Sequence, residues 1–503
     1  MQSLLQRTFA ALGWHGATQA LTQAIQFGVS IVLANLLGPH EFGLVGMVWV
    51  FTGFASVLAD MGLGAAVIQR RELSQGHLNS AFWINVGMAS LLTVGFMAAA
   101  PLVAGFYREP KLGLITAVLS FNFLLTALSI VQLSLLDRSL NFRTKFWIEM
   151  VAGVGSGIVA VLLALSGAGV WSLVSQSLLS SVTRLVVTWR LSTWRPEWSF
   201  DRHASKELFR FSGNLIGSLT IGYWGRNIDR LLMGRLLGPV PLGIFNVAFR
   251  LIAVPLDVTT NVTNSVMFPA LSGLQDDPQA VGQIYLRSTR MIALLTFPMM
   301  IAFAALAEPA VLFVLGERWR ASVPLIQLLA LSGLAQSVYQ TAWWLYLSQG
   351  RTDISLRISA YVAAVRAGGA AVGINWGVGG VALAHVVGSL VFISYPVWRS
   401  AGRLVRLRFG ELVRNLEGPF FCAAAMGVVV AGSDHWLSGH ATPAFRTVAG
   451  MVVGAVVYGI LVQQFRLQAW SDLRYVVLKV FGQSFPILVK PTGGKPLSGS
   501  EAE

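Results

Sequence analysis

The sequence predicts an all-helical, polytopic membrane protein with about fourteen transmembrane helices, arranged as two six-helix lobes plus two additional helices. Hydrophobic residues make up 55% of the 503 residues, whereas charged residues make up only 12%, about half the share of an average soluble domain. The mean hydropathy is +0.65. Apolar stretches of about 20 residues, which cross a bilayer as helices, recur along the chain. This composition excludes a soluble globular enzyme.

Fourteen segments are long enough to cross about 30 Å of hydrocarbon as helices that rise 1.5 Å per residue, although the thirteenth is marginal. They are expected at 10–36, 43–68, 80–106, 113–136, 146–166, 170–190, 209–236, 242–270, 288–315, 322–349, 356–374, 377–400, 416–432 and 445–465. The first is expected to be an uncleaved span, because no small-residue cleavage site follows a short apolar core.

Lysine and arginine are distributed unevenly among the connecting loops. With the N-terminus in the cytoplasm, 25 of the 36 fall in inside loops and six in outside loops. Positive residues are retained on the cytoplasmic side of membrane proteins. The bias predicts a multi-pass protein of the bacterial cytoplasmic (inner) membrane with both termini cytoplasmic. It also accounts for the net charge of +14 without nucleic acid as a partner.

An internal repeat divides the chain. Residues 36–43 (LLGPHEFG) and 236–243 (LLGPVPLG) both fall in an outside loop before a long span, and Gly-Pro ends a helix in a tight turn. Six spans separate the copies, so the halves share one orientation, as in a parallel repeat. The predicted domains are an N-terminal six-helix lobe at 1–190, a cytoplasmic linker at 191–208, a C-terminal six-helix lobe at 209–400, a basic loop with two additional transmembrane helices at 401–466, and a cytoplasmic interfacial helix with a disordered tail at 467–503.

Five stretches of the chain resemble a known family. They are 33–45 (LANLLGPHEFGLV), 59–70 (ADMGLGAAVIQR), 227–255 (NIDRLLMGRLLGPVPLGIFNVAFRLIAVP), 267–278 (MFPALSGLQDDP) and 316–331 (GERWRASVPLIQLLAL). In combination they resemble the polysaccharide exporter branch of the multidrug/oligosaccharidyl-lipid/polysaccharide (MOP) flippase superfamily, most closely its Wzx-type and colanic-acid-exporter-like members. The similarity covers roughly residues 1–400.

The resemblance, and not the composition, implies the substrate. It implies a flippase that moves a polyprenyl-diphosphate-linked oligosaccharide by alternating access, for lipopolysaccharide or exopolysaccharide biosynthesis. The implied partners are the lipid-linked glycan, membrane lipids, and a polysaccharide polymerase with its chain-length machinery. No cofactor or metal is expected, because the chain has no phosphate-binding Gly-rich loop and a single cysteine, Cys422.

Two other functions remain open at this stage. The first is a cation-coupled small-molecule or multidrug antiporter of the same superfamily, whose site would favour acids over arginines. The second is a membrane-embedded glycan polymerase or transferase. The short outside loops disfavour this class, because such enzymes usually carry sizeable extramembrane loops.

Four arginines are predicted inside spans of the C-terminal lobe: Arg226, Arg230, Arg250 and Arg366. Charges within spans cost at least about 2.5–3.5 kcal/mol on insertion scales, so they normally face a bundle interior or a water-filled cavity. A guanidinium group stays charged and binds phosphate oxygens bidentately. We therefore predict that these arginines bind the diphosphate. The alternative is that Asp229 and Asp257 neutralise them and fix helix packing.

Two acids are candidates for ion coupling, Asp60 and Asp257. Asp60 is the only acid well inside the N-terminal lobe, and a buried carboxyl group there could bind and release a proton or Na⁺. The alternative is a static residue at a helix end, hydrogen-bonded just before Gly62 and Gly64.

Polar residues of other spans are candidates for contacts along the sugar path: Asn122, Asn261, Asn264, Gln336, Tyr339 and Gln340. Side chains of this kind also serve as interhelical hydrogen bonds, which is the alternative. His385 is either a proton relay or a packed neutral histidine. Arg184 lies near a cytoplasmic helix end and is expected to extend its charge to the membrane surface.

Overall fold

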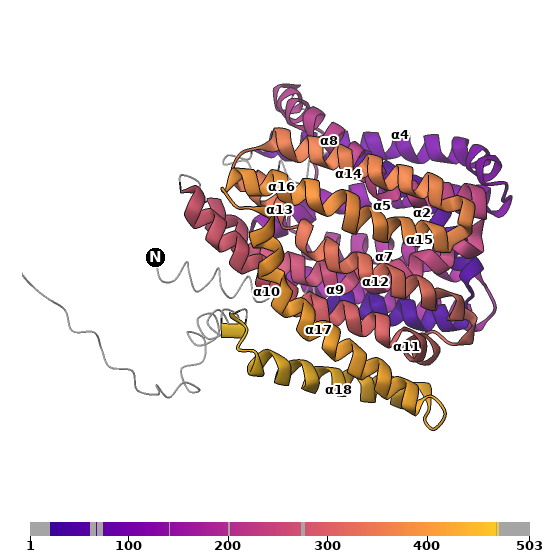
Figure 1. Cartoon of the computed structure of the whole chain (residues 1–503). Helices are drawn as coiled ribbons and strands as arrows, with labels where there is room; N and C mark the ends of the chain where they lie inside the picture. The colour runs from indigo at the N-terminus through magenta and orange to yellow at the C-terminus, as the bar shows by residue number, and fades with distance from the viewer. Residues whose placement is uncertain are drawn as a thin grey trace, which may run out of the picture.

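The computed structural model describes residues 21–60, 67, 74–139, 141–199, 202–272, 277–468 and 470–471, without the side chains at 60, 202–219, 257, 258, 260–270 and 272. Within these ranges every regular element is a helix (Figure 1). The predicted interfacial helix and tail at 467–503 fall almost entirely outside the described residues.

An N-terminal group of helices follows the first described helix, Leu21–Leu36. It consists of α2 (Pro39–Asp60), α4 (Gln75–Tyr107), α5 (Lys111–Arg138), α6 (Phe142–Leu165) and α7 (Val170–Leu191). Here α4 packs on α5, and α6 packs on α7.

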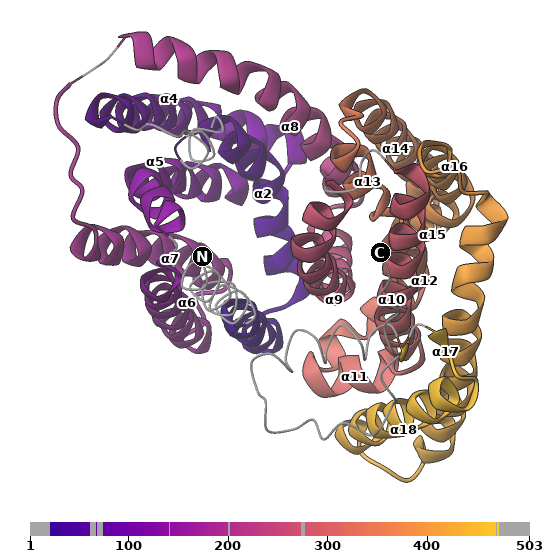
Figure 2. The same ribbon diagram turned by 90° about the vertical axis from the view of Figure 1, so that its left-hand side faces the viewer.

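A C-terminal group consists of α9 (Pro239–Ser272), α10 (Pro278–Ala305), α11 (Ala307–Val314), the 3₁₀ helix η1 (Glu317–Ser322), α12 (Val323–Tyr339), α13 (Ala342–Ser348), α14 (Thr352–Gly373), the 3₁₀ helix η2 (Ile374–Trp376), α15 (Gly377–Val387), the π-helix η3 (Gly388–Ile393) and α16 (Ser394–Leu404). The long helix α8 (Arg202–Leu237) packs on α14 and also on α2 and α4 of the N-terminal group. Figure 2 looks along the helices and shows α2 and α9 at the junction of the two groups.

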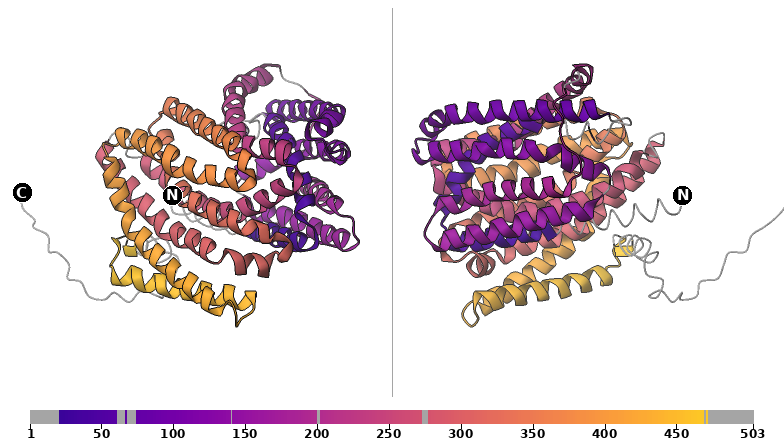
Figure 3. Two further views of the ribbon diagram at one scale, coloured as in Figure 1. Left: turned by 45° about the vertical axis from the view of Figure 1, so that its right-hand side comes forward. Right: turned by 180° about the vertical axis from the view of Figure 1, so that it is seen from behind.

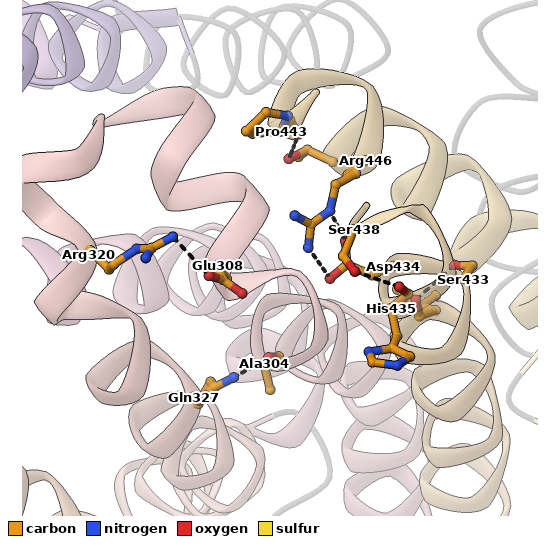
Figure 4. Close-up of polar contacts among 12 residues, drawn as sticks. Ala304, Glu308, Arg320, Gln327, Ser433, Asp434, His435, Ser438, Pro443 and Arg446 are labelled. Carbon is orange, nitrogen blue, oxygen red and sulfur yellow. Dashed lines mark hydrogen bonds and ion pairs between the residues drawn. The ribbon is translucent and has the colours of Figure 1, made fainter. Parts of the chain in front are cut away.

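The last two helices, α17 (Phe409–Leu437) and α18 (Pro443–Gln464), form a hairpin. Figure 3 shows it from two sides along the outside of the C-terminal group, where α17 packs on α10 and α18 on α11. Arg446 of α18 binds Asp434 of α17 through two nitrogens, each 2.8 Å from a carboxylate oxygen (Figure 4). This paired contact fixes the hairpin close to its turn.

The structure confirms a polytopic helical fold. By length and composition, eleven of the described helices could cross a membrane, and the helix Leu21–Leu36 is shorter. The thirteenth predicted span was too short, because α17 has 29 residues and begins at Phe409 within the basic segment. The ninth, predicted at 288–315, was displaced by ten residues, because α10 covers Pro278–Ala305 and α11 follows as a separate helix. The predicted orientation of the termini stays a prediction.

The segment between α7 and α8 is fixed to the N-terminal group. The indole of Trp194 donates to the Gln75 side chain at 2.9 Å, and the indole of Trp83 donates to the Glu197 carbonyl at 2.9 Å. The rings of Trp83 and Trp198 stack with centroids 4.1 Å apart. Helix α8 begins at Arg202, so the end of the predicted linker 191–208 is helical.

Candidate functional site

A cluster of charged side chains lies inside the C-terminal group, beginning on α8. Arg226 and Arg230 are separated by one helical turn, which places them on one face. A terminal nitrogen of Arg230 donates to the Asn227 side chain at 2.7 Å, and its guanidinium lies 4.9 Å from the centre of the Phe249 ring on α9. Arg226 is the exposed member of the two.

A buried acid balances part of this charge. Asp229 is 5% exposed and His385 of α15 is 8% exposed. Their Oδ2 and Nε2 atoms lie 3.0 Å apart. The other carboxylate oxygen of Asp229 accepts the Arg230 backbone N–H at 2.8 Å. The carboxylate also attracts the guanidinium groups of Arg230 and Arg366.

Arg366 of α14 completes the cluster. Its Nη2 donates to the hydroxyl of Tyr339, on α12, at 3.0 Å. Its guanidinium repels that of Arg226. The Nε atoms of Arg230 and Arg366 are buried and bond to no described group. Among the described side chains, the cluster holds three guanidinium groups and one carboxylate, that of Asp229, so the arginines outnumber the acid.

A separate cavity of about 350 Å³ lies between the two groups of helices. Arg250 of α9 lines it, and within the described residues no hydrogen bond or ion pair is made by this guanidinium. Aromatic and neutral polar side chains from both groups surround it: Gln26, Phe27, Ser30, Phe42, Trp49, Ser156, Gln176, Ser177, Ser180 and Asn246. No acidic residue is among the described lining residues, so Arg250 is the one charged side chain of that described lining.

Helix α9 separates the cavity from the charged cluster. Its Phe249 lies under Arg230, whereas the next residue, Arg250, lines the cavity. On the α8 side, the hydroxyl of Tyr223 donates to the backbone carbonyl of Val50 at 2.7 Å and to that of Trp49, a cavity residue, at 3.1 Å. The excess charge of the cluster therefore lies one helix away from the cavity.

Comparison with known proteins decides the family. The model of a family described as "Polysaccharide biosynthesis protein" matches residues 32–324, more than half of the chain. The chain belongs to this polysaccharide biosynthesis protein family.

Several relatives of this chain are named as polysaccharide biosynthesis or transport proteins. It is 27% identical to the teichuronic acid biosynthesis protein TuaB of Bacillus subtilis (strain 168), over 86% of this chain and 90% of that protein. It is 29% identical to the succinoglycan biosynthesis transport protein ExoT of Rhizobium meliloti (strain 1021), over 64% and 65%. It is 25% identical to the lipopolysaccharide biosynthesis protein WzxC of Escherichia coli (strain K12), over 86% and 89%.

Solved structures show the fold of this polysaccharide biosynthesis protein. The lipid II flippase MurJ, in an inward closed conformation, matches with a TM-score of 0.73 at 12% identity, over 89% of this chain and 98% of that one. An inward-facing multidrug resistance MATE family transporter of the MOP superfamily matches with a TM-score of 0.61 at 17% identity, over 76% and 96%. The family member thus has the MOP transporter fold that its sequence predicts.

The structure brings together three of the four predicted arginines and places the fourth elsewhere. Arg226, Arg230 and Arg366 share the cluster, and Arg250 lies in the cavity. Asp229, the alternative neutralising acid, lies within this cluster, and its side-chain partner there is His385. Within the part of the chain that the structure describes, no hydrogen bond or ring contact joins Arg250 to the other three.

The predicted sugar-path residues separate into three groups. Asn122 donates to Ser177, a cavity residue, at 2.9 Å. Tyr339 is 2% exposed and bonded to Arg366, and Gln336 and Gln340 lie on or next to α12 outside the cavity lining. The side chains of Asn261 and Asn264 lie outside the described residues, as do those of the two ion-coupling candidates, Asp60 and Asp257.

Sequence reasoning missed most cavity residues and the pairing of Arg184. Gln176 and Ser180 belong to a serine-rich stretch of α7, whereas Asn246 is an isolated polar residue of α9; only their shared cavity groups them. The guanidinium of Arg184 makes two hydrogen bonds, at 3.0 and 2.8 Å, to Glu149 of α6, an acid for which the sequence predicts no role.

Proposed function

We propose that this protein flips a polyprenyl-diphosphate-linked oligosaccharide across the bacterial cytoplasmic membrane, for surface or exported polysaccharide biosynthesis. The observation that carries the proposal is Arg250, a guanidinium in an interior cavity with no described counterion. A cation kept in such a place is costly unless an anion neutralises it. Diphosphate supplies that charge, and arginine binds its oxygens bidentately.

The cavity and the cluster divide the recognition of the substrate. The diphosphate binds Arg250 in the cavity, while Arg226, Arg230 and Arg366 add positive potential from the other side of α9. The sugars contact the amide, hydroxyl and aromatic side chains of the cavity, a combination that suits polar rings with apolar faces. The polyprenyl tail stays in lipid, because burying it in the cavity gains nothing over the bilayer.

The protein carries its substrate between the two faces as a transporter and has no catalytic step. Rocking of the N-terminal group against the C-terminal group opens the cavity to each side in turn. The names of ExoT, a transport protein, and MurJ, a flippase, support this proposal. In the cell it works with a polysaccharide polymerase and chain-length machinery, and its termini are cytoplasmic.

The alternative functions fit the site less well. A cation antiporter needs an acid that faces its cavity, and the described cavity lining contains none. The one described acid in contact with the cluster, Asp229, is already bound to His385. A glycan polymerase needs acids or histidines on sizeable extramembrane loops, and the described loops between spans are short.

A complementation assay in a flippase-deficient strain tests the proposal. We expect Arg250→Ala to abolish surface glycan and to accumulate the lipid-linked precursor, while Arg250→Lys restores export only in part. Arg320→Ala is the matched control, because this arginine is exposed on η1 and pairs with the exposed Glu308. Normal export by Arg250→Ala combined with Arg226→Ala, at full membrane expression, would refute the assignment.

A further inference from the structure

The two copies of the Leu-Leu-Gly-Pro repeat contact each other across the junction of the two groups. A Cβ atom on Gly43 would lie 1.8 Å from the carbonyl oxygen of Pro239, and one on Gly243 would lie 1.9 Å from the carbonyl oxygen of Pro39. Both neighbours are backbone atoms, which cannot move aside as a side chain can. The helix starts of α2 and α9 therefore approach this closely only because both positions are glycine.

The close approach continues along α2 away from the two Gly-Pro turns. A Cβ atom on Gly46 would lie 2.4 Å from the Asn246 side chain, and one on Gly53 would lie 2.6 Å from the Tyr223 hydroxyl. Side-chain ends of this kind can shift at low cost. The two backbone contacts at Gly43 and Gly243 are therefore the ones that no small adjustment relieves.

Trp319 makes a second contact between the groups at the same end. It is fully buried, and its indole N–H donates to the carbonyl of Ala34 at 2.8 Å. The ring of Phe42 meets the indole edge to face, with centroids 5.5 Å apart. The side chain of Asn35 donates to the carbonyl of Val314.

These contacts bound the cavity. Ala34, Phe42 and Leu315 line it and are also beside the residues that touch across the junction. A ligand in the cavity can leave toward the Gly-Pro turns only if α2 separates from α9 and Trp319 separates from Ala34.

We propose that Gly43, Gly243 and Trp319 form a closure contact that is made in this state and broken each time the cavity opens toward the Gly-Pro turns. The absence of a side chain at positions 43 and 243 sets the balance between the closed and open states. This inference rests on the proposed transport function. A methyl group at either position clashes only in the closed state, so it shifts the population toward the open one.

Thiol accessibility measures this balance directly. In a Cys422→Ala background, Ser30→Cys places a reporter in the cavity, and Gly439→Cys, in the exposed α17–α18 turn, identifies the side of the membrane on which the Gly-Pro turns lie. A membrane-impermeant maleimide is added from that side. We expect Gly43→Ala and Gly243→Ala each to speed labelling of the reporter about tenfold, which corresponds to a shift of about 1.4 kcal/mol.

Gly95→Ala is the matched control, because a Cβ atom there meets nothing within 4 Å. It should leave the labelling rate unchanged. Trp319→Phe keeps an aromatic ring but loses the bond to Ala34, and it should speed labelling in the same direction. If the glycine variants fail to insert into the membrane, Trp319→Phe tests the closure contact in their place.

Unchanged labelling in a folded glycine variant, or in Trp319→Phe, would overturn the closure contact. The labelling needs no glycan, so it can succeed even where the complementation assay rejects the proposed substrate. Conversely, loss of export with unchanged labelling would retain the substrate assignment and reject the closure contact.

Discussion

Substitution by methionine is expected to change the unfolding stability differently at Arg250 and at Arg446. Replacing Arg446 with methionine leaves the Asp434 carboxylate, whose side chain is 13% exposed, without its two hydrogen bonds. Removing one partner of a buried ion pair costs about 3–5 kcal/mol, because the other charge stays buried. We expect about 3 kcal/mol here, since the pair lies near the end of the hairpin (Figure 4).

Arg250→Met removes a cation for which no described carboxylate is a partner, so it leaves no charge unpaired. Methionine keeps much of the apolar stem, and the cost of holding a lone guanidinium away from water disappears. We therefore expect unfolding stability to stay the same or to rise, while binding of a polyprenyl-diphosphate glycan weakens at least about tenfold, in line with about 1.5–3 kcal/mol for a charged hydrogen bond.

Thermal unfolding of the purified protein in one detergent, followed by intrinsic tryptophan fluorescence, measures the change in stability. Binding of a short-chain polyprenyl-diphosphate glycan measures the change in affinity. If Arg250→Met destabilises the protein as much as Arg446→Met does, Arg250 has a structural counterion and the cavity is not an anion site. If Arg250→Met binds the probe normally, the diphosphate contact lies elsewhere.

The cluster and the N-terminal group give two further predictions. Tyr339→Phe removes the hydroxyl bonded to Arg366 and should weaken binding of the same glycan by about 1 kcal/mol in an equilibrium titration. The control, Tyr285→Phe, loses a hydrogen bond of similar length to a threonine and should leave binding unchanged. Equal effects of the two substitutions would contradict a role for the cluster in binding. Glu149→Gln weakens a half-buried pair with Arg184, so it should lower the melting temperature while export per folded molecule stays normal, and a selective loss of export would show that this pair has a functional role.

Hydropathy and the repeat were sufficient to predict the helical fold, because membrane helices depend on long apolar runs. Helix ends were less predictable. Helix α17 continues through Glu411, Arg414 and Glu417. These charged residues interrupt the apolar run from which a span is predicted, but they do not interrupt a helix. Propensity and capping, and not burial in lipid, determine that boundary.

The cost of charge in a membrane predicts that four arginines lie inside the bundle, and the structure leaves one of them, Arg226, exposed. Their grouping did not follow, because it depends on which helices pack. Arg366 meets Tyr339 across 27 positions, and Asp229 meets His385 across 156. No local sequence pattern predicts contacts between residues so far apart in the chain. From the sequence alone, the expected partners of Asp229 were its neighbours on α8.

The contact between Gly43 and Pro239, mirrored by Gly243 and Pro39, has the pattern of an isologous interface, in which one patch meets a copy of itself. In a dimer of identical half-length chains, every substitution on that patch would act twice, once in each subunit. Covalent fusion frees the two copies to diverge. Positions 46 and 246 have done so: a glycine on one helix faces an asparagine on the other, a pairing that two identical subunits could not encode.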